Sequence, residues 1–328
     1  MDILAASALV IGGLVLLAVG GEALVRAATT LAEMAGVSPA VIGLTVVAIG
    51  TSLPELVVSL LAAIRGEPDL AVANVVGSNI FNITATLGLT ALVIPLPVHG
   101  SAVRLEWPVM FGASLLCLVV ARGGVIDRVE GGVLLVTLVL FIGYTVRVAR
   151  RDVGPVEARQ FADQIEDRDI DRSHTKVGPP RLVVVLGILG VGIAALIGGG
   201  RLLVDGAVAL ARLAGMTERV IGLTIVAGGT GAPELATSLV AALRKRTDVA
   251  VANMIGSNIF NILGILGVTA LVAPVRVSPA LVGSDMWWMI GTGALLLPLM
   301  RSGARLTRAE AVVLVGVYGA YLLTLTRG

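Results

Sequence analysis

Long apolar segments recur along the whole chain, and most of them are long enough to cross a membrane. Of the 328 residues, 56% are hydrophobic and only 14% are charged, and the mean hydropathy is +0.97. A soluble domain carries about 25% charged residues, so this chain lacks the charge that a fully water-exposed surface requires. A helix of about 20 apolar residues spans roughly 30 Å of hydrocarbon. The composition therefore predicts an all-α membrane protein with several spans.

The apolar segments fall into two groups of five, separated by the one long polar stretch. That stretch, 150–181, is rich in charged residues and ends with two prolines, as is typical of a linker. The predicted parts are a first five-helix repeat at 1–149, a cytoplasmic charged linker at 150–181 and a second five-helix repeat at 182–328. The ten predicted spans are 3–27, 40–64, 70–94, 104–121, 129–149, 182–212, 219–243, 248–273, 280–300 and 307–326.

The two halves repeat each other. Residues 43–92 align with 222–271 without a gap, and 32 of the 50 positions are identical. Because five is an odd number, the second half must enter the membrane from the opposite side. The pattern predicts an inverted repeat, the arrangement of many secondary transporters.

The basic residues predict the orientation. The side that holds the linker carries 15 Lys and Arg, whereas the other side carries seven. Cytoplasmic loops are enriched in Lys and Arg, so we expect a cytoplasmic linker and both termini outside, in the cell inner (plasma) membrane. We expect a monomer in contact with the lipid bilayer.

Two of the spans carry a proline and a carboxylate near their middle. Pro54 and Pro233 each remove one backbone donor and free the carbonyl group four residues earlier. A carboxylate at mid-span costs at least about 2.5–3.5 kcal/mol, and the middle of these two spans holds no Lys or Arg to neutralise it. A bound cation is therefore the expected partner of Glu55 and Glu234.

The following span in each half carries neutral oxygen ligands. Ser78 and Asn82 are four residues apart and share a helical face, as do Ser257 and Asn261. Carboxylate, hydroxyl, amide and carbonyl oxygens are the ligands of hard cations such as calcium and sodium. One calcium ion or several sodium ions could neutralise two carboxylates, and each filling would exclude the other. Mutually exclusive filling is the property that an exchanger needs.

These motifs resemble the α-repeats of the calcium/cation antiporter superfamily, in its prokaryotic sodium/calcium exchanger branch. The matching text is GTSLPE with VVGSNIFN in the first half, and GTGAPE with MIGSNIFN in the second. The resemblance implies an antiporter with four adjacent ion sites around the two glutamates, and helices 1 and 6 that slide past a fixed core. It implies ligand roles for the side chains of Thr51, Ser52, Glu55, Ser78, Asn82, Thr230, Glu234, Ser257 and Asn261, and for the carbonyl groups of Ala48 and Ala227.

Two departures from the family pattern bear on the driving ion. Gly231 stands where the family usually has serine, and Asn261 stands where many relatives have aspartate. We expect sodium to drive calcium, since the many neutral oxygens suit sodium and water could replace the missing hydroxyl group. Calcium/proton exchange stays open as the alternative, because burial favours the protonated form of a carboxyl group.

Other classes of protein fit the sequence less well. An intramembrane protease would need two catalytic aspartates or a serine with a histidine, and neither histidine lies in a predicted span. A channel would not need inverted repeats with broken helices, which are typical of alternating access. We therefore predict that the protein is not an enzyme, uses no cofactor, binds no nucleic acid and has calcium and sodium ions as its partners.

A few polar residues are predicted to be structural. Asn74 and Asn253 are expected to form hydrogen bonds between helices. The pairs Glu22/Arg26 and Arg201/Asp205 are each four residues apart and are expected to form ion pairs within a helix.

Overall fold

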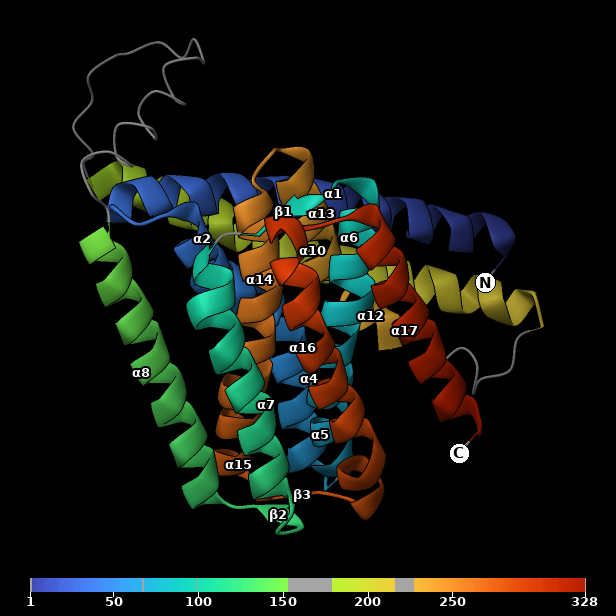
Figure 1. The fold of residues 1–328 in the computed structure, drawn as a ribbon. Helices are drawn as coiled ribbons and strands as arrows, with labels where there is room; N and C mark the ends of the chain where they lie inside the picture. The colour runs from blue at the N-terminus through green and yellow to red at the C-terminus, as the bar shows by residue number, and fades with distance from the viewer. Residues whose placement is uncertain (1, 67, 99, 153–178, 216–226, 328) are drawn as a thin grey trace, which may run out of the picture.

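The computed structural model describes residues 2–66, 68–98, 100–152, 179–215 and 227–327, and almost all of them are helical (Figure 1). The α-helices are α1 (Ile3–Ala35), α2 (Pro39–Ile42), α3 (Ala48–Thr51), α4 (Leu53–Ile64), α5 (Pro68–Phe81), α6 (Leu87–Val93), α7 (Trp107–Ala121), α8 (Arg128–Asp152), α10 (Pro179–Leu213), α12 (Ala227–Thr230), α13 (Ala232–Leu243), α14 (Thr247–Ile259), α15 (Gly267–Val272), α16 (Met286–Arg301) and α17 (Arg308–Arg327). Short π-helical segments continue several of them: η1 (Gly43–Val47), η2 (Asn82–Thr86), η3 (Ala102–Glu106), η5 (Phe260–Leu266) and η6 (Leu281–Asp285), while η7 (Ser302–Ala304) is a 3₁₀ turn.

Seven single helices in the described part are long and apolar enough to cross a membrane. They are Ile3–Ala35, Asp69–Val93, Ala102–Ala121, Arg128–Val148, Leu182–Leu213, Thr247–Val272 and Arg308–Leu325. The pair Pro39–Thr51 and Leu53–Ile64, bent by 45°, makes an eighth. The predicted span 219–243 is described only from Ala227, and 280–300 is helical as η6 and α16 without being one of the seven. The count of ten, and the inverted orientation of the halves, therefore stay predictions.

Two short antiparallel strand pairs modify the all-α prediction. Strand β1 (Leu96–Pro97) pairs with β4 (Arg305–Leu306), and β2 (Val125–Ile126) pairs with β3 (Val275–Arg276). In both pairs, one strand comes from the first half of the chain and the other from the second half. The strands therefore tie the loops of the two halves together at two places.

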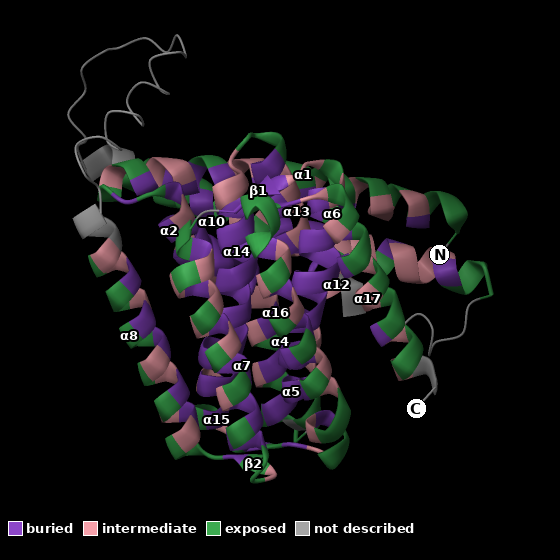
Figure 2. Cartoon of the chain, in the orientation of Figure 1, coloured by how far each residue is buried: buried purple, intermediate pink, exposed green. Residues whose placement is uncertain are grey.

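Two helices form the centre of the bundle. In Asp69–Val93 and in Thr247–Val272, 78% of the membrane-length window is buried, whereas the other spans are buried to between 17% and 39%. Figure 2 shows α14 buried along most of its length, with exposed residues concentrated on the outer helices. These central segments are the two that carry the repeated GSNIFN text, so the predicted neutral ligands lie in the protein interior.

Helices α1 and α10 pack against each other and cross the rest of the bundle at a steep angle (Figure 1). Their contact is backbone to backbone: a Cβ atom on Gly13 would lie 2.8 Å from the carbonyl oxygen of Gly199, and one on Gly20 would lie 2.9 Å from that of Gly192. Small residues allow such close approach of helices in membranes. The two helices therefore form one tightly packed unit.

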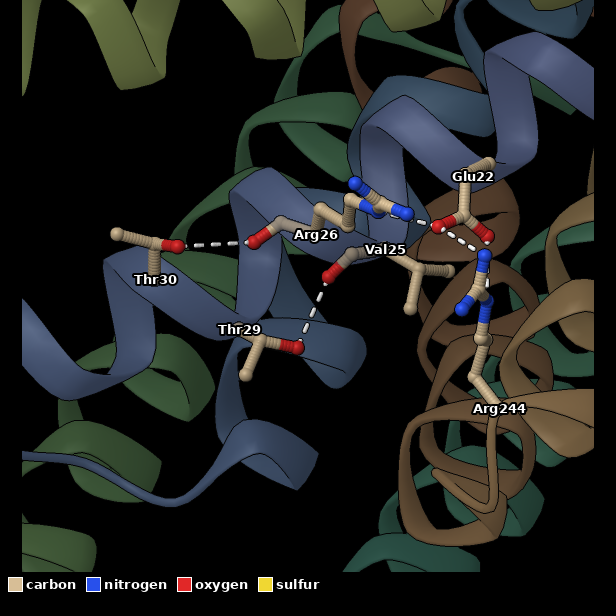
Figure 3. A network of polar contacts seen from close by, with 6 residues as sticks. All are labelled: Glu22, Val25, Arg26, Thr29, Thr30 and Arg244. Carbon is tan, nitrogen blue, oxygen red and sulfur yellow. Dashed lines mark hydrogen bonds and ion pairs between the residues drawn. The ribbon is translucent and has the colours of Figure 1, made fainter. Parts of the chain in front are cut away.

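An ion pair joins this unit to the end of α13 (Figure 3). Glu22 on α1 pairs with Arg26, as predicted, and also with Arg244. The Arg244 guanidinium donates from Nε to Glu22 Oε2 at 2.7 Å, and its second contact, to Oε1, is 2.6 Å. The predicted pair of Arg201 with Asp205 is wrong: both residues are described, and no ion pair joins them.

Arg244→Gln is expected to lower the free energy of unfolding by no more than about 1 kcal/mol, because the pair is largely exposed to solvent. Thermal unfolding in detergent would measure the change, with Lys245→Gln in the same loop as the control. A loss several times larger would show that the contact holds the two parts of the bundle together.

Candidate cation-binding site

Both copies of the proline motif break their helix at the same place. Ser52 lies between α3 and α4 with φ −87° and ψ 9°, and Gly231 lies between α12 and α13 with φ −82° and ψ 4°. Pro54 and Pro233 follow in the first turn of the next helix, where a missing backbone donor costs nothing. The break predicted from the sequence is confirmed in both halves.

The two glutamates lie in the first turn of the helices that follow the breaks. Glu55 on α4 and Glu234 on α13 are each 1% exposed. The Ser52 hydroxyl donates to Glu234 Oε1 at 3.0 Å, so a residue of the first half binds the carboxylate of the second. Ser52 precedes α4, which carries Glu55 in its first turn, so this bond places the Glu234 carboxyl group beside the start of that helix. The structure therefore brings together the two acids that lie 179 positions apart in the chain.

The four predicted neutral ligands lie on the two central segments. Ser78, Asn82, Ser257 and Asn261 are all buried. Asn82 begins the π-helical segment η2, which packs against α13, and Asn261 lies in η5, which packs against α4. Each asparagine thus lies on a segment that packs against the helix carrying the glutamate of the other half. Single π-helical turns inside α-helices are frequent at functional sites.

Several buried side-chain oxygen atoms, including one of each glutamate, have no hydrogen-bond partner. In the described part of the chain, ten buried side-chain nitrogen or oxygen atoms lack a partner. Five belong to predicted ligands: Glu55 Oε2, Glu234 Oε2, Asn82 Oδ1, Asn261 Oδ1 and Ser257 Oγ. The others are the hydroxyl groups of Thr86, Thr145, Thr237 and Thr269, and Asn253 Oδ1. Buried acceptors are normally satisfied, and a cation bound at these atoms would satisfy them.

The charge of this group suits a cation held mostly by neutral oxygens. Within the described residues, no cluster of three or more His, Cys, Asp or Glu side chains could hold a metal ion. Two carboxylates and a set of amide and hydroxyl oxygens are what the site offers. This donor set matches calcium and sodium rather than zinc or copper, which favour nitrogen and sulfur ligands.

The remaining predicted ligands are less well defined. The Thr51 hydroxyl donates to the Ala48 carbonyl oxygen at 3.3 Å, and that oxygen also accepts from Ser52 N at 3.1 Å. Thr230 is half-buried at the end of α12, and Ala227 is the first residue of that helix. The ligand roles of these residues stay predictions, as do those of the residues above.

A phenyl ring occupies the space beside Gly231. A Cβ atom at this position would lie 2.4 Å from Phe81 Cε1 and 2.5 Å from Cδ1, so the ring lies where a side chain would begin. The ring also packs edge-on against Tyr318, with centroids 5.5 Å apart. Phe81 therefore fills the space in which a side chain at position 231 would begin.

The equivalent phenylalanine of the second half lies close to a glycine of its own helix. Phe260 contacts the Gly264 position, one turn along its own helix, where a Cβ atom would lie 2.6 Å from the ring. Both phenylalanines occur in the same text, SNIFN. No local signal could therefore have shown that Phe81 lies against the helix break of the other half.

Two further asparagines support the site, as predicted. Asn74 Nδ2 donates to Ser59 Oγ at 2.9 Å and to the backbone oxygen of Glu55 at 3.1 Å. Asn253 Nδ2 donates to Ser238 Oγ at 3.2 Å. These bonds join neighbouring helices and confirm the structural role expected for both residues.

Comparisons with known proteins agree with this arrangement. The family model described as sodium/calcium exchanger protein matches residues 5–147 and again 184–327. The sodium/calcium exchanger MaX1 of Methanosarcina acetivorans is 32% identical in a match that covers 95% of this chain and 96% of that protein. The inner membrane protein YrbG of Escherichia coli is 37% identical in a match that covers 98% of this chain and 97% of that protein.

A solved structure of the sodium-calcium exchanger NCX_Mj, soaked with zero Na⁺ and Ca²⁺, superposes with a TM-score of 0.81. The match covers 99% of this chain and 100% of that one, at 28% identity. The double match to one family model, the full-length relatives and the helix breaks that bring two acids together lead to one conclusion. The chain is a multi-pass membrane protein that belongs to the sodium/calcium exchanger family of cation antiporters.

Proposed function

We propose that the protein exchanges calcium for sodium by alternating access, with the ions bound between Glu55 and Glu234. The observation that carries this proposal is the group of five buried, unpartnered oxygens contributed by both halves. Two ionised carboxylates carry two negative charges, which one calcium ion balances. Sodium ions balance the same charge only when more than one is bound, and the neutral oxygens of the central segments provide their further ligands.

The motion that we propose is a sliding of α1 and α10 along the bundle. These two helices pack backbone to backbone and therefore move as one unit. Their contact with α13 includes Gly21, where a Cβ atom would lie 3.2 Å from a Val240 methyl carbon. Such a sliding would expose the two glutamates to one side of the membrane and then to the other.

Calcium/proton exchange is the second candidate, and Phe81 favours it. The ring takes the place of a hydroxyl group beside the second helix break. Sodium loses a ligand there, whereas a proton needs only the carboxylate. Ser52 provides the corresponding hydroxyl group in the first half. The missing hydroxyl group at position 231 therefore affects only one side of the site, and sodium remains the proposed driving ion.

Calcium flux in proteoliposomes tests the driving ion directly. We expect a sodium gradient at clamped, equal pH to drive calcium uptake, because the neutral oxygens favour sodium. A pH gradient without sodium is expected to leave uptake near the level of empty liposomes. Uptake that follows only the pH gradient would replace this proposal with the proton alternative.

We also propose that the protein lies in the cell inner (plasma) membrane as a monomer, with both termini outside and the linker in the cytoplasm. The excess of Lys and Arg on the linker side supports this orientation. Most of the linker, 153–178, lies outside the described residues.

Reporter fusions test the orientation. A fusion after Ile165 is expected to be active in the cytoplasm, and one after Gly328 is expected to be active outside. A cytoplasmic C-terminus would contradict the inverted arrangement of the two halves, and the symmetric site with it.

A further inference from the structure

Two asparagines of the repeated GSN text, Asn79 and Asn258, lie at the contact between the two central segments. Each is 1% exposed. Asn79 Nδ2 donates to the Asn258 backbone oxygen at 3.3 Å, and Asn258 Nδ2 donates to the Asn79 backbone oxygen at 3.3 Å. Their amides also donate to thioether sulfurs, to Met289 at 3.6 Å and to Met110 at 3.7 Å. Carbonyl and thioether groups only accept, so these contacts determine which way both amides face.

The oxygen atoms of the same two amides face the predicted ligands. Asn79 Oδ1 accepts from Asn261 Nδ2 at 3.1 Å, and Asn258 Oδ1 accepts from Asn82 Nδ2 at 3.1 Å. An amide oxygen cannot donate, so Asn261 and Asn82 must direct their nitrogen atoms toward it. Their own oxygen atoms are left over, and both are buried without a partner among the described residues.

We infer that Asn79 and Asn258 are positioning residues, which turn the amides of Asn261 and Asn82 so that oxygen, not nitrogen, is available to a cation. This inference rests on the proposed function, because it takes Asn82 and Asn261 as cation ligands. An asparagine amide has nearly the same shape in both orientations, but its NH₂ group repels a cation and its oxygen binds one. The backbone carbonyl groups of each central segment thus orient the amide of Asn79 or Asn258. That amide in turn determines whether the ligand asparagine presents its oxygen or its nitrogen to a cation.

A double-mutant cycle between positions 79 and 261 tests this role. Asn79→Leu removes the acceptor that orients Asn261, and Asn261→Asp replaces the amide with a group that has oxygen on both sides. The readout is the apparent affinity of the purified protein for calcium chloride and for sodium chloride, measured as thermal stabilisation in detergent. This readout requires binding only, so it does not depend on which ion drives transport.

We expect Asn79→Leu to weaken cation binding roughly tenfold when residue 261 is asparagine. In the Asn261→Asp background, the same change is expected to leave binding within about twofold or to strengthen it, because aspartate needs no orientation and no longer faces the Asn79 oxygen. An equal loss of cation affinity in both backgrounds would overturn the inference. Replacing an asparagine with a purely structural role would weaken binding by the same factor in each.

The mirror cycle, Asn258→Leu with Asn82→Asp, gives the same test if Asn79→Leu does not fold. Asn253→Leu is the matched control, because Asn253 is buried on the same segment but donates to Ser238. Asn253→Leu is expected to change the apparent cation affinity by the same factor with asparagine or with aspartate at position 261. If the wild-type protein binds a cation but Asn79→Leu weakens binding equally in both backgrounds, this inference alone is overturned. If the wild-type protein binds neither calcium nor sodium, the proposed function is overturned as well.

Discussion

Glu55→Gln and Glu234→Gln are each expected to abolish calcium exchange. Both carboxylates are 1% exposed, and each supplies one unpartnered oxygen to the same group of five. Removing one of them halves the charge that balances calcium and leaves a divalent ion in a site of low dielectric with a single counter-charge. Because a buried charge without its partner costs about 3–5 kcal/mol, the apparent calcium affinity should fall by a factor of several hundred or more.

The measurement is sodium-driven calcium uptake into proteoliposomes, together with calcium-dependent thermal stabilisation of the purified variants. Glu106→Gln is the matched control: Glu106 is also a buried glutamate in a membrane-length helix, and it lies outside the proposed site. Its variant is expected to retain exchange. Retained exchange in both Glu55→Gln and Glu234→Gln would remove the glutamates from the site.

Gly231→Ser is expected to disturb the protein on its own and to improve sodium use only when Phe81 is shortened. The serine Cβ atom would lie 2.4 Å from the Phe81 ring, a contact that forces the ring to move. Overpacking of this kind costs about 1–3 kcal/mol. In Gly231→Ser/Phe81→Ala the space is open, and the new hydroxyl group can act as Ser52 does in the first half.

We expect the double variant to need roughly tenfold less sodium for half-maximal calcium exchange than Phe81→Ala alone, the effect of about one added ligand. Phe260→Ala is the matched control, because this ring lies against Gly264 and is not among the atoms nearest to position 231. In Gly231→Ser/Phe260→Ala, the Phe81 ring still lies against the new serine, so the steric contact should remain. If Gly231→Ser alone is as stable as the wild type and needs less sodium for half-maximal exchange, Phe81 does not restrict this side of the site.

Much of the candidate site was predictable because its causes are local. Proline lacks a backbone donor wherever it stands, so the breaks at Ser52 and Gly231 follow from Pro54 and Pro233. The repeat at a spacing of 179 predicts two equivalent acids, and the structure places both in first turns after a break. Composition alone predicts a membrane protein, since too few charged residues are present to cover a water-exposed surface.

The count of spans was harder to derive. The stretch 280–300 was predicted as a span from its apolar character, and the structure makes it helical as η6 followed directly by α16, but it is not one of the seven helices that are long and apolar enough to cross a membrane. The four short strands were not predicted at all. Two-residue strands have no periodicity to detect, and they form here only because loops from opposite halves meet.

By itself, then, the sequence determined the class of protein, the repeat, the helix breaks and the identity of the acids. Only the tertiary structure decided that Phe81 of the first half lies against Gly231 of the second half. It also decided that Arg244 reaches Glu22, and that Asn79 and Asn258 orient the ligand amides. Helix breaks depend on residues within one turn, but these contacts join residues about 150–220 positions apart, and their geometry exists only when both halves of the bundle have packed together.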